Sequence, residues 1–197
     1  MADMRLHGSL TSPYVRKVRI VIAETGLDCH FVVTDVWAPD NGIERLNPLG
    51  RVPVLEIDGL EPLFDSFTIL EHLDRCHGLG LLRAGDERDE AMRWHALGHG
   101  VIDAVVARLL ELRRPPELRS ADRMAREEER VARTLAAMER MVKTGGELFP
   151  DRIGLAEVTV ATALQYVDFR FRHEWREYAP ELAAVGDRGS ILSTMPA

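Results

Sequence analysis

The chain has 197 residues, of which 46% are hydrophobic and 29% are charged, and its formal net charge is −7. This length and apolar content suffice for one sizeable domain or two small ones. The acidic balance disfavours nonspecific binding to nucleic acid. No apolar run reaches about 18 residues, and the first five residues lack the features of a signal peptide. We therefore expect a soluble, cytoplasmic protein without a membrane span.

The two cysteines, Cys29 and Cys76, stand far apart and form no Cys-x-x-Cys unit. This spacing argues against a disulfide framework or a redox pair within the chain. The sequence also shows no internal repeat, and the charge-rich stretch 120–143 is typical of a solvated helix face.

The first 78 residues alternate strand and helix signals. Strands are expected at 4–8, 30–34, 52–57 and 60–64, and an Asp58-Gly59 turn joins the last two as an antiparallel hairpin. Helices are expected at 13–25 and from Phe67 to about Cys76, with a single helical turn at 42–46 in the intervening loop. The order βαβ, loop, ββα predicts a small mixed sheet with helices on its faces.

A glycine-punctuated linker at 79–85 follows, and strand signals disappear beyond it. Helices are expected at 86–113, ended by Pro115-Pro116, and at 121–143, ended by Gly145-Gly146. An apolar helix at 154–169 and a shorter one at 176–185 follow. The sequence therefore predicts an α/β domain at 1–78 and an all-helical domain at 86–197.

The turn before the first helix is the best candidate for a working site. Ser12 falls at the helix N-cap and Pro13 in the first turn, a strong start signal. Capping alone explains this pair. Free N–H groups and the positive end of the helix dipole also converge there, however, so an anion beside Ser12 would be stabilised.

Three segments together resemble the glutathione transferase family: 11–14 (Thr-Ser-Pro-Tyr), 47–55 (Asn-Pro-Leu-Gly-Arg-Val-Pro-Val-Leu) and 64–66 (Phe-Asp-Ser). The resemblance covers essentially the whole chain. It implies a thioredoxin-like N-terminal domain, a helical second domain, a homodimer and glutathione as co-substrate in detoxification. The Ser-Pro-aromatic turn most resembles the serine-type bacterial, tau and zeta branches.

The resemblance implies that Ser12 donates its hydroxyl proton to the glutathione thiolate, with Ser9 as an alternative. Lowering a thiol pKa of about 8.5 by about two units needs roughly 2.7 kcal/mol. A helix N-terminus supplies up to about 2 kcal/mol, and a hydrogen bond to a charged group about 1.5 to 3 kcal/mol. The two together suffice. No Ser-His-Asp pattern surrounds Ser12, so it is expected to stabilise the thiolate and not to act as a nucleophile.

The other two segments would hold the rest of glutathione. In the family, the proline equivalent to Pro53 is cis and turns the backbone of Val52 toward the ligand's cysteine like an added strand. Asp65 would pair with the γ-glutamyl ammonium group and Ser66 with its carboxylate. Plain N-capping explains the same pair. Weaker candidates for the glycine carboxylate and the rim are Arg51, Arg16 and Trp37.

The electrophile site is expected between the domains, formed by Tyr14 and the inner face of the 86–113 helix, including His99 and Asp103. Phe169 and Phe171 would close it. His95, His99 and Asp103 also recur every four residues, a spacing that could chelate a divalent metal. A structural His pair is the more common outcome, and no further Cys or His ligand is evident, so no metal is expected.

Two alternatives to a transferase stay open, namely a non-catalytic transferase-like binding or regulatory protein and a helical metal-binding module. One departure from the family pattern concerns the helix at 154–169. Its expected start is a Ser or Thr three residues before an Asp, whereas Gly154 and Glu157 stand there. Gly can cap and Glu can partly substitute. A second departure is Arg188-Gly189-Ser190, where Arg-Pro-Ser is usual.

Overall fold

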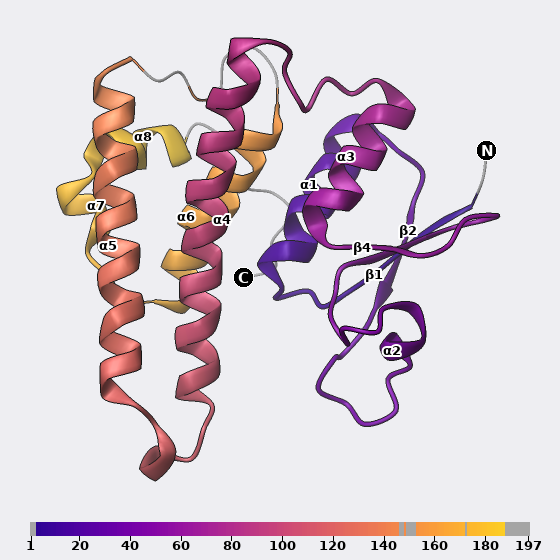
Figure 1. The fold of residues 1–197 in the computed structure, drawn as a ribbon, viewed down its shortest axis with the longest axis horizontal. Coiled ribbons are helices and arrows are strands. Elements are labelled where there is room, and N and C mark those ends of the chain that lie inside the picture. Colours follow the sequence, from indigo (N-terminus) through magenta and orange to yellow (C-terminus); the bar gives the residue numbers. More distant parts are fainter. Residues whose placement is uncertain (1–2, 146–147, 149–152, 172, 188–197) are drawn as a thin grey trace. The chain divides into compact units, whose positions relative to one another are not determined.

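The computed structural model describes residues 3–145, 148, 153–171 and 173–187 (Figure 1). The chain divides into two compact units after Leu82, a position inside the predicted linker at 79–85, and each unit is treated by itself. Within the described ranges, no helix is both long and apolar enough to cross a membrane. The segment 188–197, including Arg188-Gly189-Ser190, lies outside the described residues.

The first unit is built on the predicted mixed sheet, in the order β2-β1-β3-β4. Its strands are β1 (Met4–Gly8), β2 (His30–Val33), β3 (Val54–Ile57) and β4 (Leu63–Phe64). Strand β1 runs parallel to β2 and antiparallel to β3, and β3 runs antiparallel to β4. Alternate residues of β1 are buried, as the period of two along a strand requires when one face is covered.

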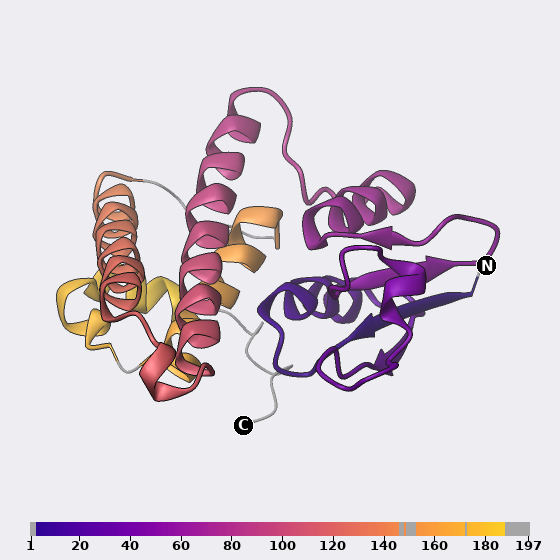
Figure 2. The same cartoon turned by 60° about the horizontal axis from the view of Figure 1, so that its bottom comes forward.

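Helices α1 (Pro13–Thr25) and α3 (Ser66–His77) lie side by side on the sheet (Figures 1 and 2). Both bury an apolar stripe, in which Val15, Val18, Ile69 and Leu73 are fully buried. The single turn α2 (Ile43–Leu46) interrupts the long loop after β2, as expected. The sequence prediction of this unit is thus confirmed in element type and order.

Strands β3 and β4 are shorter than predicted. Strand β3 begins at Val54 and not at residue 52, and β4 begins at Leu63 and not at residue 60. Proline has no N–H to donate to a ladder. Because Pro53 and Pro62 stand directly before these strands, the pairing starts one residue after each proline.

The second unit is helical, as predicted. Helices α4 (Asp86–Leu112) and α5 (Ala121–Lys143) run side by side, joined through the 3-10 turn Pro116–Leu118 (Figures 1 and 2). Helix α6 (Leu155–Arg170) packs on α4, and its residues are buried on nearly every face. A helix that is apolar all round belongs in the centre of a bundle. Helix α6 is therefore the core of this unit.

The single helix predicted at 176–185 is wrong. The segment forms two helices, α7 (Trp175–Tyr178) and α8 (Pro180–Asp187). Ala179 separates them with a φ of −130°, because a residue before proline is displaced from helical conformation. Glu139 of α5 then caps α8, accepting hydrogen bonds from the backbone N–H of Leu182 at 2.8 Å and of Glu181 at 3.4 Å.

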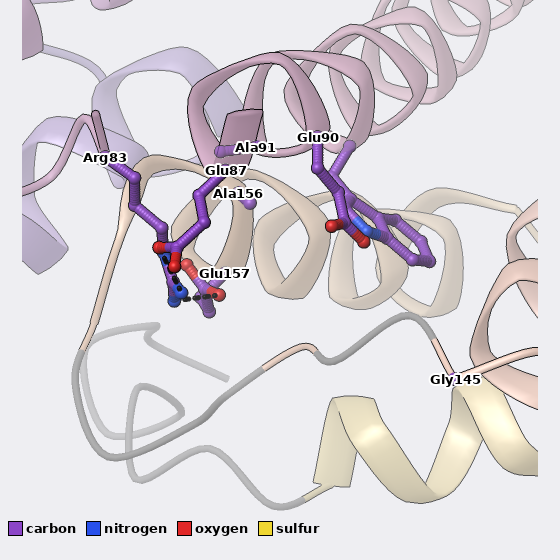
Figure 3. Close-up of a pocket in the computed structure, with 8 residues that line it drawn as sticks. Arg83, Glu87, Glu90, Ala91, Gly145, Ala156 and Glu157 are labelled. Carbon is purple, nitrogen blue, oxygen red and sulfur yellow. Dashed lines mark hydrogen bonds and ion pairs between the residues drawn. The ribbon is translucent and has the colours of Figure 1, made fainter. Parts of the chain in front are cut away.

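The start of α6 also differs from expectation. Gly154 is the N-cap, but Glu157 makes no hydrogen bond back to it among the described residues. The buried Glu157 carboxylate instead faces Arg83, 3.5 Å from its Nη2, while Nη1 of the same guanidinium lies 3.6 Å from Glu87 (Figure 3). These side chains border a hollow of about 260 Å³. An ion pair with the linker thus replaces the reciprocal cap.

Candidate functional site

The register of the sheet brings the three sequence segments to one edge. His7 of β1 lies opposite Val54 of β3, and Val54 lies opposite Phe64 of β4. The chain beyond β1, the chain before β3 and the chain beyond β4 therefore leave the sheet at the same end. Those positions hold Ser9 to Ser12, Val52-Pro53 and Asp65-Ser66 respectively.

Ser12 stands at the N-terminus of α1, as predicted. Its Oγ accepts a hydrogen bond from the backbone N–H of Val15 at 3.4 Å, and its carbonyl accepts from Arg16 N–H at 3.0 Å. The cap uses a lone pair of Oγ, so the hydroxyl proton can still be donated to an anion. Capping and thiolate stabilisation are therefore compatible at one side chain.

Ser9, the alternative thiol ligand, is tied into the turn itself. Its Oγ lies 3.3 Å from Thr11 Oγ1 and 3.4 Å from Thr11 N, and its carbonyl accepts from Ser12 N–H at 3.2 Å. Ser9 precedes the helix by one turn of chain, whereas Ser12 meets the first free N–H groups. The field of the helix dipole therefore favours Ser12.

The peptide bond between Val52 and Pro53 is cis, as the resemblance implied. The loop before it is held by Asn47, which is buried and donates through Nδ2 to the carbonyl of Arg51 at 2.8 Å. Asn47 Oδ1 accepts from Leu49 N–H at 3.0 Å. The Arg51 side chain is exposed, so it is accessible to a ligand at this edge.

Asp65, not Ser66, is the N-cap of α3. Its Oδ1 accepts from Phe67 N–H at 2.8 Å and from Thr68 N–H at 3.2 Å. Both bonds use the same oxygen, so Oδ2 remains for another partner. Asp65 also has a φ of 72°, in the region that L residues rarely adopt.

Ser66 is the first residue of α3 and is 1% exposed. Its Oγ is buried and makes no hydrogen bond within the described part of the chain. A buried hydroxyl without a partner is unusual and needs an explanation. A ligand carboxylate at the helix N-terminus would supply the missing acceptor and would be stabilised by the helix dipole.

Arg16 and Trp37, two of the weaker candidates for the glycine carboxylate and the rim of the site, differ in exposure. Arg16 is 2% exposed, and burial, helped by the charge of Arg19, lowers the pKa of its guanidinium to about 10. Trp37 is 66% exposed, in the loop after β2. A rim role therefore fits Trp37 better than Arg16.

Comparisons with known proteins agree with this geometry. The model "Glutathione S-transferase, N-terminal domain" matches residues 6–80, and "Glutathione S-transferase, C-terminal domain" matches residues 121–187. The uncharacterized GST-like protein YibF of Escherichia coli (strain K12) is 34% identical over 169 residues, covering 85% of this chain and 83% of that protein. The chain belongs to the glutathione S-transferase family.

Two solved glutathione S-transferase structures resemble the whole chain. The enzyme of Methylobacillus flagellatus KT, with glutathione bound, is 33% identical with a TM-score of 0.90, covering 99% of this chain and 100% of that one. A family member from Pseudomonas fluorescens Pf-5, with bound S-(propanoic acid)-glutathione, is 32% identical with a TM-score of 0.84 over the same shares. The predicted family and fold are thus confirmed, while the serine-type branch stays a prediction.

The predicted electrophile residues of this family member fall in both units. Tyr14 is half-buried on α1, with Lys17 Nζ 5.9 Å from its ring centre. His99 Nε2 lies 3.7 Å from Asp103 Oδ1 on α4. Phe169 is 43% exposed, and the Arg170 guanidinium lies 4.0 Å from its ring centre. These assignments stay predictions.

Phe171 does not have the exposure expected of a residue that closes a substrate site. It is 5% exposed, and the Arg108 guanidinium covers its ring at 4.5 Å. Arg108 is in turn held by Glu128 of α5, with Nε 2.6 Å from Oε1. Phe171 is therefore a packing residue of the helical unit.

The metal-binding alternative finds no support in the geometry. His95 is buried, and its Nδ1 lies 2.8 Å from Thr159 Oγ1, which joins α4 to α6. Across the described ranges, no group of three or more His, Cys, Asp or Glu residues is arranged to hold a metal ion. The His95 side chain is accounted for as a buried hydrogen-bonding residue.

Sequence reasoning missed two residues that position the site. Gly8 is the last residue of β1, and a Cβ built on it would lie 2.4 Å from Val15 Cγ1 of α1. Only glycine lets the first turn of α1 approach the strand end so closely. The second residue is Asn47. The sequence Asn47-Pro48 indicated a turn, but it did not indicate the hydrogen bond from the Asn47 side chain to the carbonyl of Arg51.

Proposed function

We propose that this protein is a catalytically active glutathione transferase, in which Ser12 stabilises the glutathione thiolate for attack on a small apolar electrophile. The observation that carries the proposal is the convergence on one sheet edge of the Ser12 cap, the cis Val52–Pro53 bond and the Ser66 hydroxyl, which has no partner among the described residues. The relatives with glutathione bound support the ligand.

Each end of glutathione has a matching group at this edge. The γ-glutamyl carboxylate would accept a hydrogen bond from Ser66 Oγ at the N-terminus of α3, and its ammonium group would pair with Asp65 Oδ2. The cysteine backbone would pair with the Val52 N–H and C=O as an added strand does. Arg51 and Trp37 would border the glycine carboxylate. The sulfur is then directed to the Ser12 hydroxyl.

Activation of the thiol rests on two contributions of similar size. The N-terminus of α1 stabilises an anion by up to about 2 kcal/mol in a partly buried setting. A hydrogen bond from Ser12 to the charged sulfur contributes about 1.5 to 3 kcal/mol. Their sum exceeds the roughly 2.7 kcal/mol that a two-unit fall in pKa requires. Tyr14, His99, Asp103 and Phe169 are the residues proposed to contact the electrophile.

Ser12→Ala tests the role of the hydroxyl. We expect the variant to bind glutathione, to raise the pKa of the bound thiol and to lower kcat/KM roughly ten- to a hundredfold, since one donor to the thiolate is lost. The bound thiolate is followed by its ultraviolet absorbance as a function of pH, and turnover with a chlorinated nitroaromatic probe.

Ser9→Ala is the matched control, because it removes a hydroxyl from the same turn. Loss of the Ser12 cap also costs about 1 kcal/mol of stability, so the unfolding of each variant is measured in parallel. An unchanged thiol pKa in Ser12→Ala with a raised one in Ser9→Ala would transfer the role to Ser9. Glutathione binding without turnover in the parent protein would instead indicate a binding protein.

We further propose that the protein is a cytoplasmic homodimer. The family resemblance supports the dimer. The reducing cytoplasm suits a thiol co-substrate and the two free cysteines.

A further inference from the structure

The hollow of about 260 Å³ in the second unit lies beside the N-terminal turns of α4 and α6 (Figure 3). Pockets for drug-sized ligands span roughly 300 to 1,000 Å³, so this one suits a smaller molecule. All of its lining belongs to the second unit, so it is a feature of that unit alone. Its walls include Arg83 before α4, Glu87, Glu90, Ala91 and Trp94 on α4, and Ala156 and Glu157 on α6.

Two buried side chains of this lining each carry a polar atom that has no hydrogen-bond partner among the described residues. These atoms are Nε1 of Trp94, a side chain 1% exposed, and Oε2 of Glu157, a side chain 2% exposed. Buried polar atoms normally form hydrogen bonds. An indole N–H can only donate and a carboxylate oxygen can only accept. An occupant that satisfies both atoms therefore brings one acceptor and one donor.

Arg83 leaves part of the Glu157 carboxylate without a partner. Its Nη2 lies 3.5 Å from Glu157 Oε1, and its Nη1 lies 3.6 Å from Glu87 Oε2. Charge-assisted hydrogen bonds between nitrogen and oxygen are usually about 2.7 to 2.9 Å long. One guanidinium is thus shared between two carboxylates at longer range, and Glu157 Oε2 remains for a ligand in the hollow.

The walls of the hollow carry an excess of negative charge. The three carboxylates of Glu87, Glu90 and Glu157 stand against the single guanidinium of Arg83. The N-termini of α4 and α6 offset this excess by roughly half a positive charge each, so about one negative charge is left. This balance favours a cation. Among the residues that the structure describes, no three His, Cys, Asp or Glu side chains are grouped to hold a metal ion, so an organic cation fits better.

We propose that this hollow binds a small amino alcohol, in which a short alkyl chain joins a primary ammonium group to a hydroxyl. The ammonium group has three donors and no acceptor, so it satisfies Glu157 Oε2 but not the Trp94 N–H. The hydroxyl accepts from Trp94 Nε1 and donates its own proton to the exposed Glu90 carboxylate. Ala91 and Ala156, both buried, border the alkyl chain. Binding is reversible and uses none of the residues assigned to glutathione.

Calorimetric titration of the full-length protein with matched compounds tests the chemical class. Ethanolamine, propanolamine and butanolamine are compared with the alkylamines and the alcohols of the same chain length, in phosphate buffer because Tris is itself an amino alcohol. The amino alcohol that binds most tightly should have a Kd at least tenfold below that of its matched alkylamine, since the alkylamine leaves the buried Trp94 N–H unpaired. The matched alcohol, which has no charge, should bind more weakly than either.

The indole N–H of Trp94 reports binding directly by nuclear magnetic resonance. The chain has three tryptophans, and their indole signals are assigned by substituting each with phenylalanine. The Trp94 signal should move downfield with the amino alcohol, while those of Trp37 and Trp175 stay in place. Trp94→Phe should raise the Kd of the amino alcohol at least fivefold and leave that of the matched alkylamine unchanged.

Two glutamate variants test the ends of the ligand. Glu157→Gln should weaken the amino alcohol and the alkylamine alike, at least tenfold, because both carry the ammonium group. Glu90→Gln changes an exposed side chain and should weaken only the amino alcohol. Glu129→Gln, which removes a carboxylate from the exposed pair with Arg133, is the control and should change neither Kd.

Urea denaturation checks that each variant folds. If Glu157→Gln does not fold, Glu90→Gln and Trp94→Phe still test the site. Equal affinities for the amino alcohol and its matched alkylamine, a Trp94 signal that does not move, or no saturable binding at millimolar concentrations would overturn the proposal.

Discussion

Asp65 has an unusual backbone conformation, which supports its place in the proposed glutathione site. Asp65 and Asp40 are the two non-glycine residues with positive φ among those the structure describes. Holding an L residue in a sparsely populated region costs on the order of 1 to 3 kcal/mol and is common at ligand sites. The conformation places Asp65 Oδ1 on the helix amides and directs the chain into Ser66.

Ser66→Ala and Asp65→Asn test this arrangement at the residue scale. Ser66 Oγ is buried, with no partner in the part of the chain that the structure describes, and Asp65 makes the cap, so Ser66→Ala should leave stability unchanged or slightly higher. The same change should weaken glutathione binding roughly ten- to a hundredfold, by about 1.5 to 3 kcal/mol. Calorimetric titration with glutathione and urea denaturation measure the two quantities.

Asp65→Asn complements that variant, because asparagine caps a helix about as well as aspartate. It should keep the stability of α3 but lose affinity through the missing charge beside the ligand's ammonium group. Unchanged affinity in both variants would leave Asp65 and Ser66 as a helix start only.

At the scale of elements, Gly8 decides how closely α1 approaches β1. Gly8→Ala places a methyl group 2.4 Å from Val15 Cγ1 and 2.7 Å from Cγ2. The β-branched Val15 is fully buried and stiff, so it cannot move aside easily. We expect a loss of about 1 to 3 kcal/mol in unfolding free energy, typical of overpacking. Urea denaturation measures it.

Gly100→Ala is the matched control for the same chemical change. Gly100 lies inside α4, and a Cβ there would meet no atom within 4 Å. Alanine in a helix interior is more stable than glycine by roughly 0.5 to 1 kcal/mol. The two variants should therefore shift stability in opposite directions. A stability gain in Gly8→Ala would contradict the close packing of α1 on β1.

Glu111 ties the end of α4 to the start of α5. It is 2% exposed, and its Oε1 accepts from Ser120 N–H at 2.8 Å and from Arg114 Nη1 at 2.9 Å. The Ser120 N–H, followed by the charges of Arg114 and Arg123, lowers the pKa of Glu111 despite its burial. The native state therefore favours the ionised carboxyl more strongly than the unfolded chain does.

The sign of the pH dependence follows from that shift. The stabilisation is complete above the unfolded pKa of about 4.3 and disappears as the pH falls through the lower pKa of the folded state. Glu111→Gln should thus be less stable than the parent at pH 7, and the difference should shrink below about pH 4. Glu129→Gln, at an exposed pair with Arg133, is the control and should change little.

The sequence predicted elements best where one local signal decides them. Ser12-Pro13 and Gly26 determined the ends of α1, and the Asp58-Gly59 turn indicated the hairpin. The prediction of one helix at 176–185 overlooked a local signal, because Pro180 displaces the preceding Ala179 from helical conformation. Sequence reasoning also fails where distant residues decide, as in the cap that Glu139 supplies to α8 from 42 positions before Glu181. The register that brings Pro53 beside Asp65 is likewise a pairing between strands, which no single segment encodes.

The structural positions of the candidate site residues were predictable where a local signal marks them, while their roles stay predictions. Ser12 and Asp65 stand in recognisable caps, and the family resemblance supplied Val52-Pro53. Gly8 and Asn47 were missed because their importance lies in one close approach and one side-chain bond.

At the scale of the whole molecule, we expect a homodimer in which β4 and α4 contribute contacts. Static light scattering across micromolar concentrations should give twice the mass of the 22.2 kDa chain. A mass of one chain at every concentration would contradict the expected dimer. It would not bear on the glutathione site, which lies within each chain.

The two-residue strand β4 has a consequence for how the family's sequences can vary in length. Side chains alternate faces along a strand, so a slip of one residue exchanges inward and outward positions. A residue inserted between Leu63 and Phe64 would cause such a slip or a bulge, and either would displace Asp65 and Ser66 relative to Val54, the partner of Phe64. The position of the ligand-binding end therefore depends on the length of this strand, whereas the loops at 35–42 and 58–62 can change length without moving it.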